Sequence, residues 1–149
     1  MKKMISKKII GDIVETHETT ASFDTVIEKL AEAVSENNFS IAATHDLKST
    51  YEKQNLKLDD DFEYKIVQIC NAEKSHKALT SMSFDLGIMM PKSIVVARKG
   101  GVTSLRFMKM KPWMVSLMFP DIDIVPMSKM VTEIMRKIVL ETIEKSQTN

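Results

Sequence analysis

The residues best placed to do chemistry together lie in the segment from Cys70 to His76. Cys70 stands directly before an expected helix, for which Asn71 is the expected cap, and the positive end of a helix dipole favours a thiolate. The ring of His76 is expected to lean toward the inner side of that helix. A thiolate and an imidazole could then form a nucleophile–base pair, or half of a metal site. The simpler interpretation makes Cys70 a small buried residue at a strand end and His76 a partly exposed helix residue.

A second group of potential ligands consists of His17, His45 and Asp46, which stand at or just after the ends of the first two expected strands. Two imidazoles and a carboxylate are a set that binds transition metals. The side chains would meet only if the two strand ends were adjacent, and nothing in their spacing requires this. Histidines near strand ends are common on protein surfaces, so solvated positions are the simpler interpretation.

Methionine is abundant in this chain, with 12 residues, and all but the first two lie between Met82 and Met135. Met89 and Met90, with those that follow, could line an adaptable apolar pocket or a soft Cu(I) site. An ordinary core in which methionine replaces leucine is the simpler interpretation. Trp113 is the only tryptophan, and it could edge a pocket, anchor a dimer contact or fill the core.

Composition excludes several classes of protein. Lysine and arginine number 21 against 20 acidic residues, so the net charge of +1 gives no global field for nucleic acid, and no nucleic-acid partner is expected. No apolar run is long enough to span a membrane. Cys70 is the single cysteine, which rules out a disulfide within the chain. No signal-peptide pattern is visible, so we expect a cytoplasmic protein.

Familiar catalytic motifs are missing from the sequence. There is no Gly-x-Ser-x-Gly elbow, no phosphate-binding glycine loop, no dinucleotide fingerprint and no His-Glu-x-x-His pair. The sequence therefore leaves open whether the chain is an enzyme, and it identifies no cofactor.

The elements that must position these residues can be predicted from periodicity and turn signals. A strand over about 8–18 is followed by a helix that Ser22 caps and that Asn37-Asn38 ends. The remaining elements are strands over 39–43 and 62–69, short helices after Asp46 and over 72–79, a hairpin of strands 88–98 and 102–110 joined by Gly100-Gly101, a helical turn over 112–118, and a helix from Pro126 or Ser128 to about 145. Pro91 predicts an edge position or a bulge early in the first hairpin strand.

This order predicts an α+β fold of the β-α-β4-α type with short helical inserts, in one domain over 1–149 with a core at about 8–145. Two long helices would pack on one face of a mostly antiparallel sheet, giving two layers. The second face of the sheet would then be polar or covered by another copy. Val67, Ile69 and the run Ile94–Val96 indicate apolar residues on both faces, so we expect a homodimer.

Three blocks of the sequence, found in order, resemble the domain of unknown function 302 family over roughly residues 20–140. The first block runs from Phe23 to Lys48, and the second runs from Tyr64 to Leu79 and contains Cys70-Asn71. The third combines Leu86–Pro91 with Ile94–Val96. The resemblance implies a two-layer α+β fold that is often dimeric, and no established activity.

Two departures from the family pattern concern the candidate site. Members commonly have a proline where this chain has Ala72, and a cysteine where it has Lys92. The second departure removes the partner thiol that a paired-cysteine site would use. The resemblance therefore gives little support to a thiol–metal or redox role in this chain.

We expect a homodimeric domain that binds a small molecule between sheet and helices, because the methionine cluster suits an apolar pocket and catalytic motifs are absent. The candidate ligand-binding residues are Cys70, Asn71, His76, Met89, Met90, Lys92 and Trp113. The alternative is a metal-binding or redox enzyme that uses the thiol of Cys70 with His76. A structural or protein-partner role also stays open.

Overall fold

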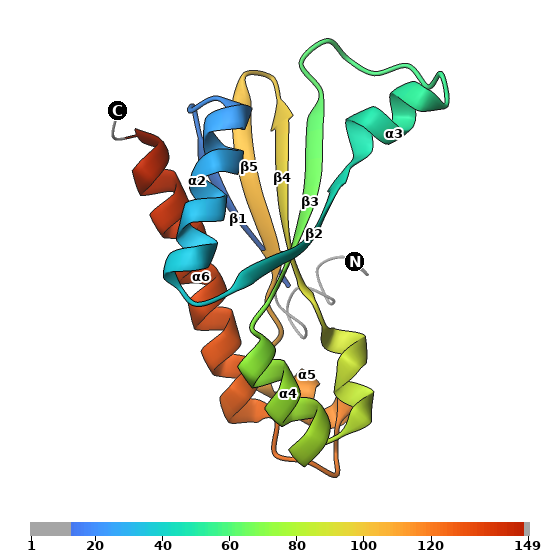
Figure 1. Ribbon diagram of the computed structural model, residues 1–149, viewed down its shortest axis with the longest axis vertical. Helices are drawn as coiled ribbons and strands as arrows, with labels where there is room; N and C mark the ends of the chain where they lie inside the picture. The colour runs from blue at the N-terminus through green and yellow to red at the C-terminus, as the bar shows by residue number, and fades with distance from the viewer. Residues whose placement is uncertain (1–12, 148–149) are drawn as a thin grey trace, which may run out of the picture.

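The computed structural model describes residues 13–147, which form one five-stranded sheet and a set of helices (Figure 1). The elements in chain order are β1 (Val14–Thr19), α2 (Phe23–Glu36), β2 (Ser40–Asp46), α3 (Leu47–Lys53), β3 (Glu63–Cys70), α4 (Ala72–Ser81), the 3-10 helix η1 (Phe84–Met89), β4 (Lys92–Lys99), β5 (Val102–Met108), α5 (Pro112–Met118) and α6 (Val125–Gln147). The predicted α+β class and the order of strands and helices are confirmed.

The sheet has the strand order β1-β5-β4-β3-β2, and every neighbouring pair is antiparallel. The two long helices, α2 and α6, cover one of its faces, as predicted (Figure 1). An amide–carboxylate hydrogen bond joins them, from Asn37 Nδ2 to Glu141 Oε2 at 2.9 Å. None of the helices within residues 13–147 is long and apolar enough to cross a membrane.

Local signals set the ends of the elements where the sequence predicted them. The hydroxyl of Ser22 accepts a hydrogen bond from the Thr25 amide at the start of α2, and Asn38 ends that helix with a φ of 64°. Gly100 and Gly101 have φ values of 61° and 77°, which a two-residue type I′ hairpin turn requires at both positions.

The main core fills the space between the sheet and the two long helices. Its buried side chains come from alternate positions of the inner strands and from the facing stripes of α2 and α6. The most deeply buried of the large ones are Leu30, Ile69, Ile94, Leu105 and Ile138. Val67 and Val96 point into this same core, together with Ile69 and Ile94. Of the five residues from which two apolar sheet faces were predicted, only Val95 lies on the other face.

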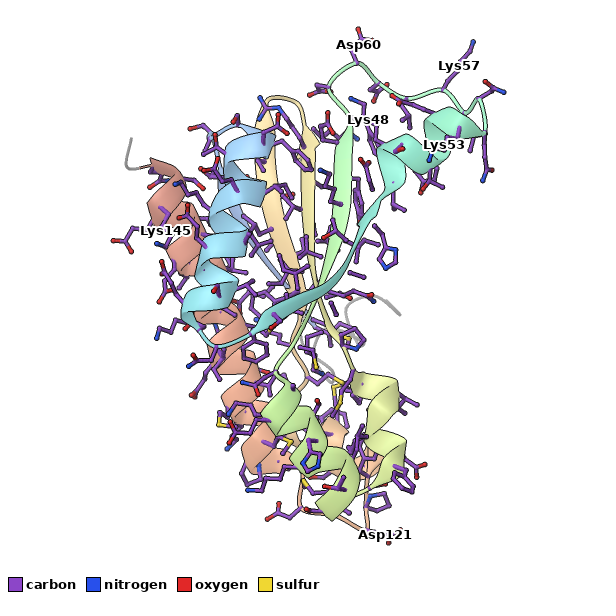
Figure 2. The ribbon with its side chains drawn as sticks, in the orientation of Figure 1. Lys48, Lys53, Lys57, Asp60, Asp121 and Lys145 are labelled. Atoms are coloured by element: carbon purple, nitrogen blue, oxygen red, sulfur yellow. The ribbon has the colours of Figure 1, made fainter. Side chains whose placement is uncertain are left out.

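A second, smaller core lies beyond one end of the sheet, where the first half of α6 extends past the strands (Figure 1). There α4, η1 and α5 pack around the buried side chains of Ala78, Leu86, Val115, Phe119 and Ile124. The sulfur atoms in Figure 2 gather at this end of the molecule. The methionines that pack against this core are Met82, Met89, Met90, Met110 and Met127.

Charged side chains mark the far ends of the structure (Figure 2). Lys48, Lys53, Lys57 and Asp60 surround α3 and the loop after it, whereas Asp121 lies at the opposite end, below the second core. Lys145 lies where α6 runs beside α2, and its ammonium contacts Glu36 Oε1 at 2.9 Å.

Two predicted strands differ from the observed ones, and part of a third lies outside the described residues. The segment 88–91 does not belong to β4, because residues 84–89 form η1 and the strand begins at Lys92. Short apolar runs such as this fit a strand or a buried helical turn equally well. β4 lies between β5 and β3, so the edge position predicted from Pro91 is wrong, and Pro91 stands before the strand. β2 continues to Asp46 instead of ending at residue 43, and the predicted strand residues 8–12 lie outside the described residues.

Candidate functional site

A cavity of about 110 Å³ lies between the main core and the second core. Ile69 and Met135 of the main core line one side, and Leu86, Val115 and Phe119 of the second core line the other. Pro91 lines the cavity and is exposed, so the cavity reaches the protein surface. The candidate ligand-binding residues predicted from the sequence that line this cavity are Cys70, Asn71, Met89, Met90 and Lys92.

The junction of β3 and α4 places Cys70 and Asn71 at the cavity. The strand ends at Cys70, and the side chain of Asn71 caps α4 by accepting a hydrogen bond from the Lys74 amide at 3.0 Å. Asn71 Nδ2 also donates to the Asn38 carbonyl at 3.1 Å, which fixes this turn against the start of β2. Cys70 is half-buried, and its thiol is free.

The opposite wall is formed where η1 leads into β4. Met89 ends η1, Met90 and Pro91 connect the two elements, and Lys92 is the first residue of β4. Lys92 pairs with Ile69 across the β3–β4 ladder and shares a sheet face with Ile94, so it lies on the face that the helices cover. The position at which the family resemblance predicts a second cysteine is therefore at the same cavity as Cys70.

The third wall is formed by α6, whose apolar stripe is predicted from the sequence to be part of an ordinary core. The side chains of this helix that line the cavity are Met127, Ser128, Val131, Thr132 and Met135. Their spacing of three and four residues is the usual signal for a buried helix face, which does not distinguish a core from a cavity wall. Two hydroxyls on an otherwise apolar stripe are the feature that could have indicated a cavity.

The electrostatics of the cavity come from Lys74 and Lys92. Burial lowers the pKa of Lys92 from its ordinary value, because desolvation disfavours the charged form of the amine. Lys74 lies in the first turn of α4, where the helix dipole favours an acid instead. The lining residues that the structure describes include no aspartate and no glutamate. The cavity is thus apolar with cationic groups at its wall.

Two of the predicted ligand residues lie elsewhere. His76 is exposed on α4 and is not part of the cavity lining, so the structure does not bring it to the cavity with Cys70. Trp113 is 44% exposed on α5 and also lies outside the lining. α5 reaches the cavity through Val115 instead. The sequence could not locate these two side chains, because their position depends on how α4 and α5 face the sheet.

The structure separates His17 from His45. His17 lies on β1 and His45 on β2, which are the two opposite edge strands of the sheet. His17 Nε2 is 2.8 Å from Glu15 Oε2, His45 Nε2 is 3.1 Å from Gln68 Oε1, and Asp46 caps α3 through the Ser49 amide. Across residues 13–147 no three histidine, cysteine or acidic side chains are grouped so that they could hold a metal ion. The adjacency that a site of His17, His45 and Asp46 requires does not exist.

Comparison with known proteins identifies the family. Residues 15–141 match the family described as domain of unknown function DUF302. The chain is also similar to a solved structure, the crystal structure of an uncharacterized conserved protein DUF302 from Bacillus stearothermophilus. The two are 18% identical, with a TM-score of 0.69 over 91% of this chain and 98% of that one, a likeness that concerns the fold. No curated protein matches the sequence. The match over most of its length shows that the chain belongs to the DUF302 family.

Proposed function

We propose that this chain is a small-molecule-binding domain, and that the cavity between its two cores holds a compact, largely apolar ligand. The observation that carries the proposal is the cavity of about 110 Å³ with its wall of methionine, aromatic and aliphatic side chains. An apolar cavity of about 150 Å³ can hold benzene or xenon, and this one is smaller but reaches the surface at Pro91, so a ligand there must be compact or extend through that opening. Methionine side chains adapt their shape to a ligand at little cost.

The position of the cavity supports a binding role over a packing defect. Its walls come from β3, β4, β5, α4, η1, α5 and α6, so a ligand there would contact elements of both cores. Polar groups are few, and they include Asn71, Ser75, Ser128 and Thr132. Binding pockets for small molecules have this composition, with an apolar lining and a few polar groups that orient the ligand.

We also propose that the domain acts as a homodimer through the open face of its sheet. The two long helices, α2 and α6, both cover the other face. Ile66 and Val95 pair across β3 and β4 on the open face, and both are half-buried. Glu18 and Arg106 lie on the same face, and a twofold contact could bring the acid of one copy to the base of the other.

The cytoplasmic location expected from the sequence stays a prediction.

The binding proposal is tested by thermal unfolding with small neutral probes such as benzene, toluene and benzyl alcohol. A ligand that binds only the folded chain raises the midpoint temperature as its concentration rises. We expect saturable stabilisation, which Ser75→Leu should abolish because the larger side chain fills the cavity from α4. If none of these probes changes the midpoint temperature at millimolar concentration, the proposal fails.

Thr80→Leu is the matched control for this test. Ser75 and Thr80 are both on α4, and each hydroxyl donates to a carbonyl of the same helix, Ser75 to Ala72 and Thr80 to His76. Thr80 is exposed and does not line the cavity. Thr80→Leu should therefore keep the ligand-dependent rise in midpoint temperature that Ser75→Leu loses.

The dimer is tested by sedimentation equilibrium at micromolar concentrations. The wild-type chain should sediment as a dimer, and Val95→Glu should sediment as a monomer because it places a charge at the centre of the open face. The exposed substitution Leu140→Glu, on α6, is the control and should remain dimeric. A wild-type chain that is monomeric at the highest concentration tested contradicts the proposal.

A further inference from the structure

The charged groups at the cavity point to the chemistry of its ligand. The titratable side chains among its described lining residues are Cys70, Lys74 and Lys92. Two of the three are amines, and no carboxylate faces them from the wall. A ligand placed in this cavity is thus surrounded by apolar side chains and meets an uncompensated positive charge.

Lys92 has no partner for its ammonium within the part of the chain that the structure describes. Neither a hydrogen bond nor an ion pair joins it to any residue of 13–147, although other half-buried lysines, such as Lys48 and Lys145, each hold a glutamate. Its strand position on β4 directs it into the layer between sheet and helices. Lysine is rarely placed in such surroundings without a partner, because its desolvation is costly.

Lys74 also lines the cavity, and its ammonium has one weak partner, in an exposed contact. Its ammonium donates to the thioether sulfur of Met130 at 3.7 Å, and a thioether is a poor acceptor. It also lies in the first turn of α4, a helix of ten residues whose positive end is at Asn71. The positive end of the helix dipole therefore disfavours this cation, and a bound anion would offset both the dipole and the unpaired charge of Lys92.

We infer that the ligand is a small apolar monocarboxylate whose carboxylate lies between Lys92 and Lys74 and whose apolar part lies among the methionines. This inference rests on the proposed function, because it assigns a chemical class to the ligand of the same cavity. A phosphate suits the site less well, since it is doubly charged and the wall around the two amines is mostly apolar. A carboxylate leaves most of a small ligand apolar, as the lining requires.

The experiment compares benzoate, benzamide and benzylamine by isothermal titration at pH 7.5 with the full chain. The three probes have similar size and differ in charge, being anionic, neutral and cationic. We expect benzoate to bind at least about tenfold more tightly than benzamide, and benzylamine to bind most weakly. Lys92→Met should lower benzoate affinity by about tenfold and leave benzamide affinity nearly unchanged.

The control and the outcomes separate this inference from the proposed function. Lys77→Met removes a cation from the exposed side of α4, outside the cavity, and should leave all affinities unchanged. If benzamide and benzoate bind equally well, with Ser75→Leu blocking both, the cavity binds ligands and the inference about charge is overturned. If no probe binds and Ser75→Leu changes nothing, the proposed function and the inference fail together.

Discussion

Arg136 of α6 forms a bidentate ion pair with Glu15 of β1. The Nη2–Oε1 distance is 2.7 Å, and Nε lies 2.9 Å from Oε2. His17 and Lys109 surround the same carboxylate, at 2.8 and 3.6 Å, and the Glu15 side chain is only 12% exposed. This cluster fastens an edge strand to the closing helix across 121 positions of the chain. It accounts for His17 as a structural residue.

Replacing Glu15 should destabilise the fold in a pH-dependent way. The hydrogen bond from Arg136 is the main reason that the pKa of Glu15 falls from 4.5 to about 2. A folded-state pKa below the unfolded value stabilises the fold fully above about pH 4.5, and that contribution is lost as the pH falls towards 2. We expect Glu15→Gln to lower the free energy of unfolding by about 2 kcal/mol at pH 7. Urea unfolding at pH 7 and pH 3 should show a smaller difference from wild type at the lower pH.

Glu28→Gln is the control for this measurement. The side chain of Glu28 is 70% exposed and lies 4.0 Å from Lys29, so its ion pair contributes little. Its unfolding free energy should stay within about 0.5 kcal/mol of wild type. A Glu15→Gln variant that shows the same deficit at pH 3 as at pH 7 would mean that the ion pair does not carry the effect.

The local parts of this fold could be predicted because their signals lie within a few residues of one another. Ser22 and Asn71 cap helices through amides three positions along, and Gly100-Gly101 forms the hairpin turn on its own. Cys70 and Asn71 can be predicted because they stand where a strand ends and a helix begins, whereas Lys92 is singled out by its departure from the family pattern. The prediction fails where one local pattern fits two structures, as at η1, where an apolar run was predicted to be a strand.

The arrangement of the cavity could not be predicted, because it depends on contacts between distant elements. α6 is longer than the sheet it covers, so its first half forms a second core, and the cavity lies where the two cores meet. Lys74 was missed because only the packing of α4 shows which of its side chains face inward. The strand order likewise places His17 and His45 on opposite edges, which strand ends alone do not reveal.

The hairpin turn gives a second prediction. Gly101 has a φ of 77°, which a residue with a Cβ adopts only with strain, although open space surrounds the position. Gly101→Ala should therefore lower the free energy of unfolding by about 1 kcal/mol. Chemical unfolding at pH 7 measures this difference.

Gly87 is the matched control for the turn variant. It lies in η1 with an ordinary negative φ, and an added Cβ would meet only the Cδ2 atom of Leu79, at 3.9 Å. Gly87→Ala should be neutral or slightly stabilising, because alanine restricts the unfolded chain. Equal losses in both variants would show that the effect at Gly101 is not conformational.

Removing Leu86 should weaken the second core without destroying the first. Its side chain is 2% exposed between α4 and α5, and it lines the cavity. We expect Leu86→Ala to lower the free energy of unfolding by about 3 kcal/mol, because it removes buried methyl groups and enlarges the cavity. Hydrogen exchange should accelerate for amides of α4 and α5 and much less for those of β4. Uniform acceleration in all three elements would contradict the division into two cores.

The reactivity of the Cys70 thiol distinguishes a binding domain from a thiol enzyme. The thiol is half-buried at the cavity wall, and its predicted partner His76 lies outside the lining. In a binding domain, Cys70→Ser should change ligand affinity by no more than about twofold, because serine preserves the size of the side chain and the methionine wall carries the contact. A thiol enzyme requires instead a cysteine that iodoacetamide alkylates well below pH 8.5, about the pKa of a free thiol.

The alkylation rate of Cys70 at pH 6.5, followed by mass spectrometry, decides between these two roles. For a binding domain the native chain should react more slowly than the same chain in urea, and benzoate should slow it further by occupying the cavity. His76→Gln serves as the control, and it should leave the rate unchanged because His76 is exposed on α4. Native alkylation faster than that of the unfolded chain, and slowed by His76→Gln, would instead establish an activated thiol and shift the function of the cavity to catalysis.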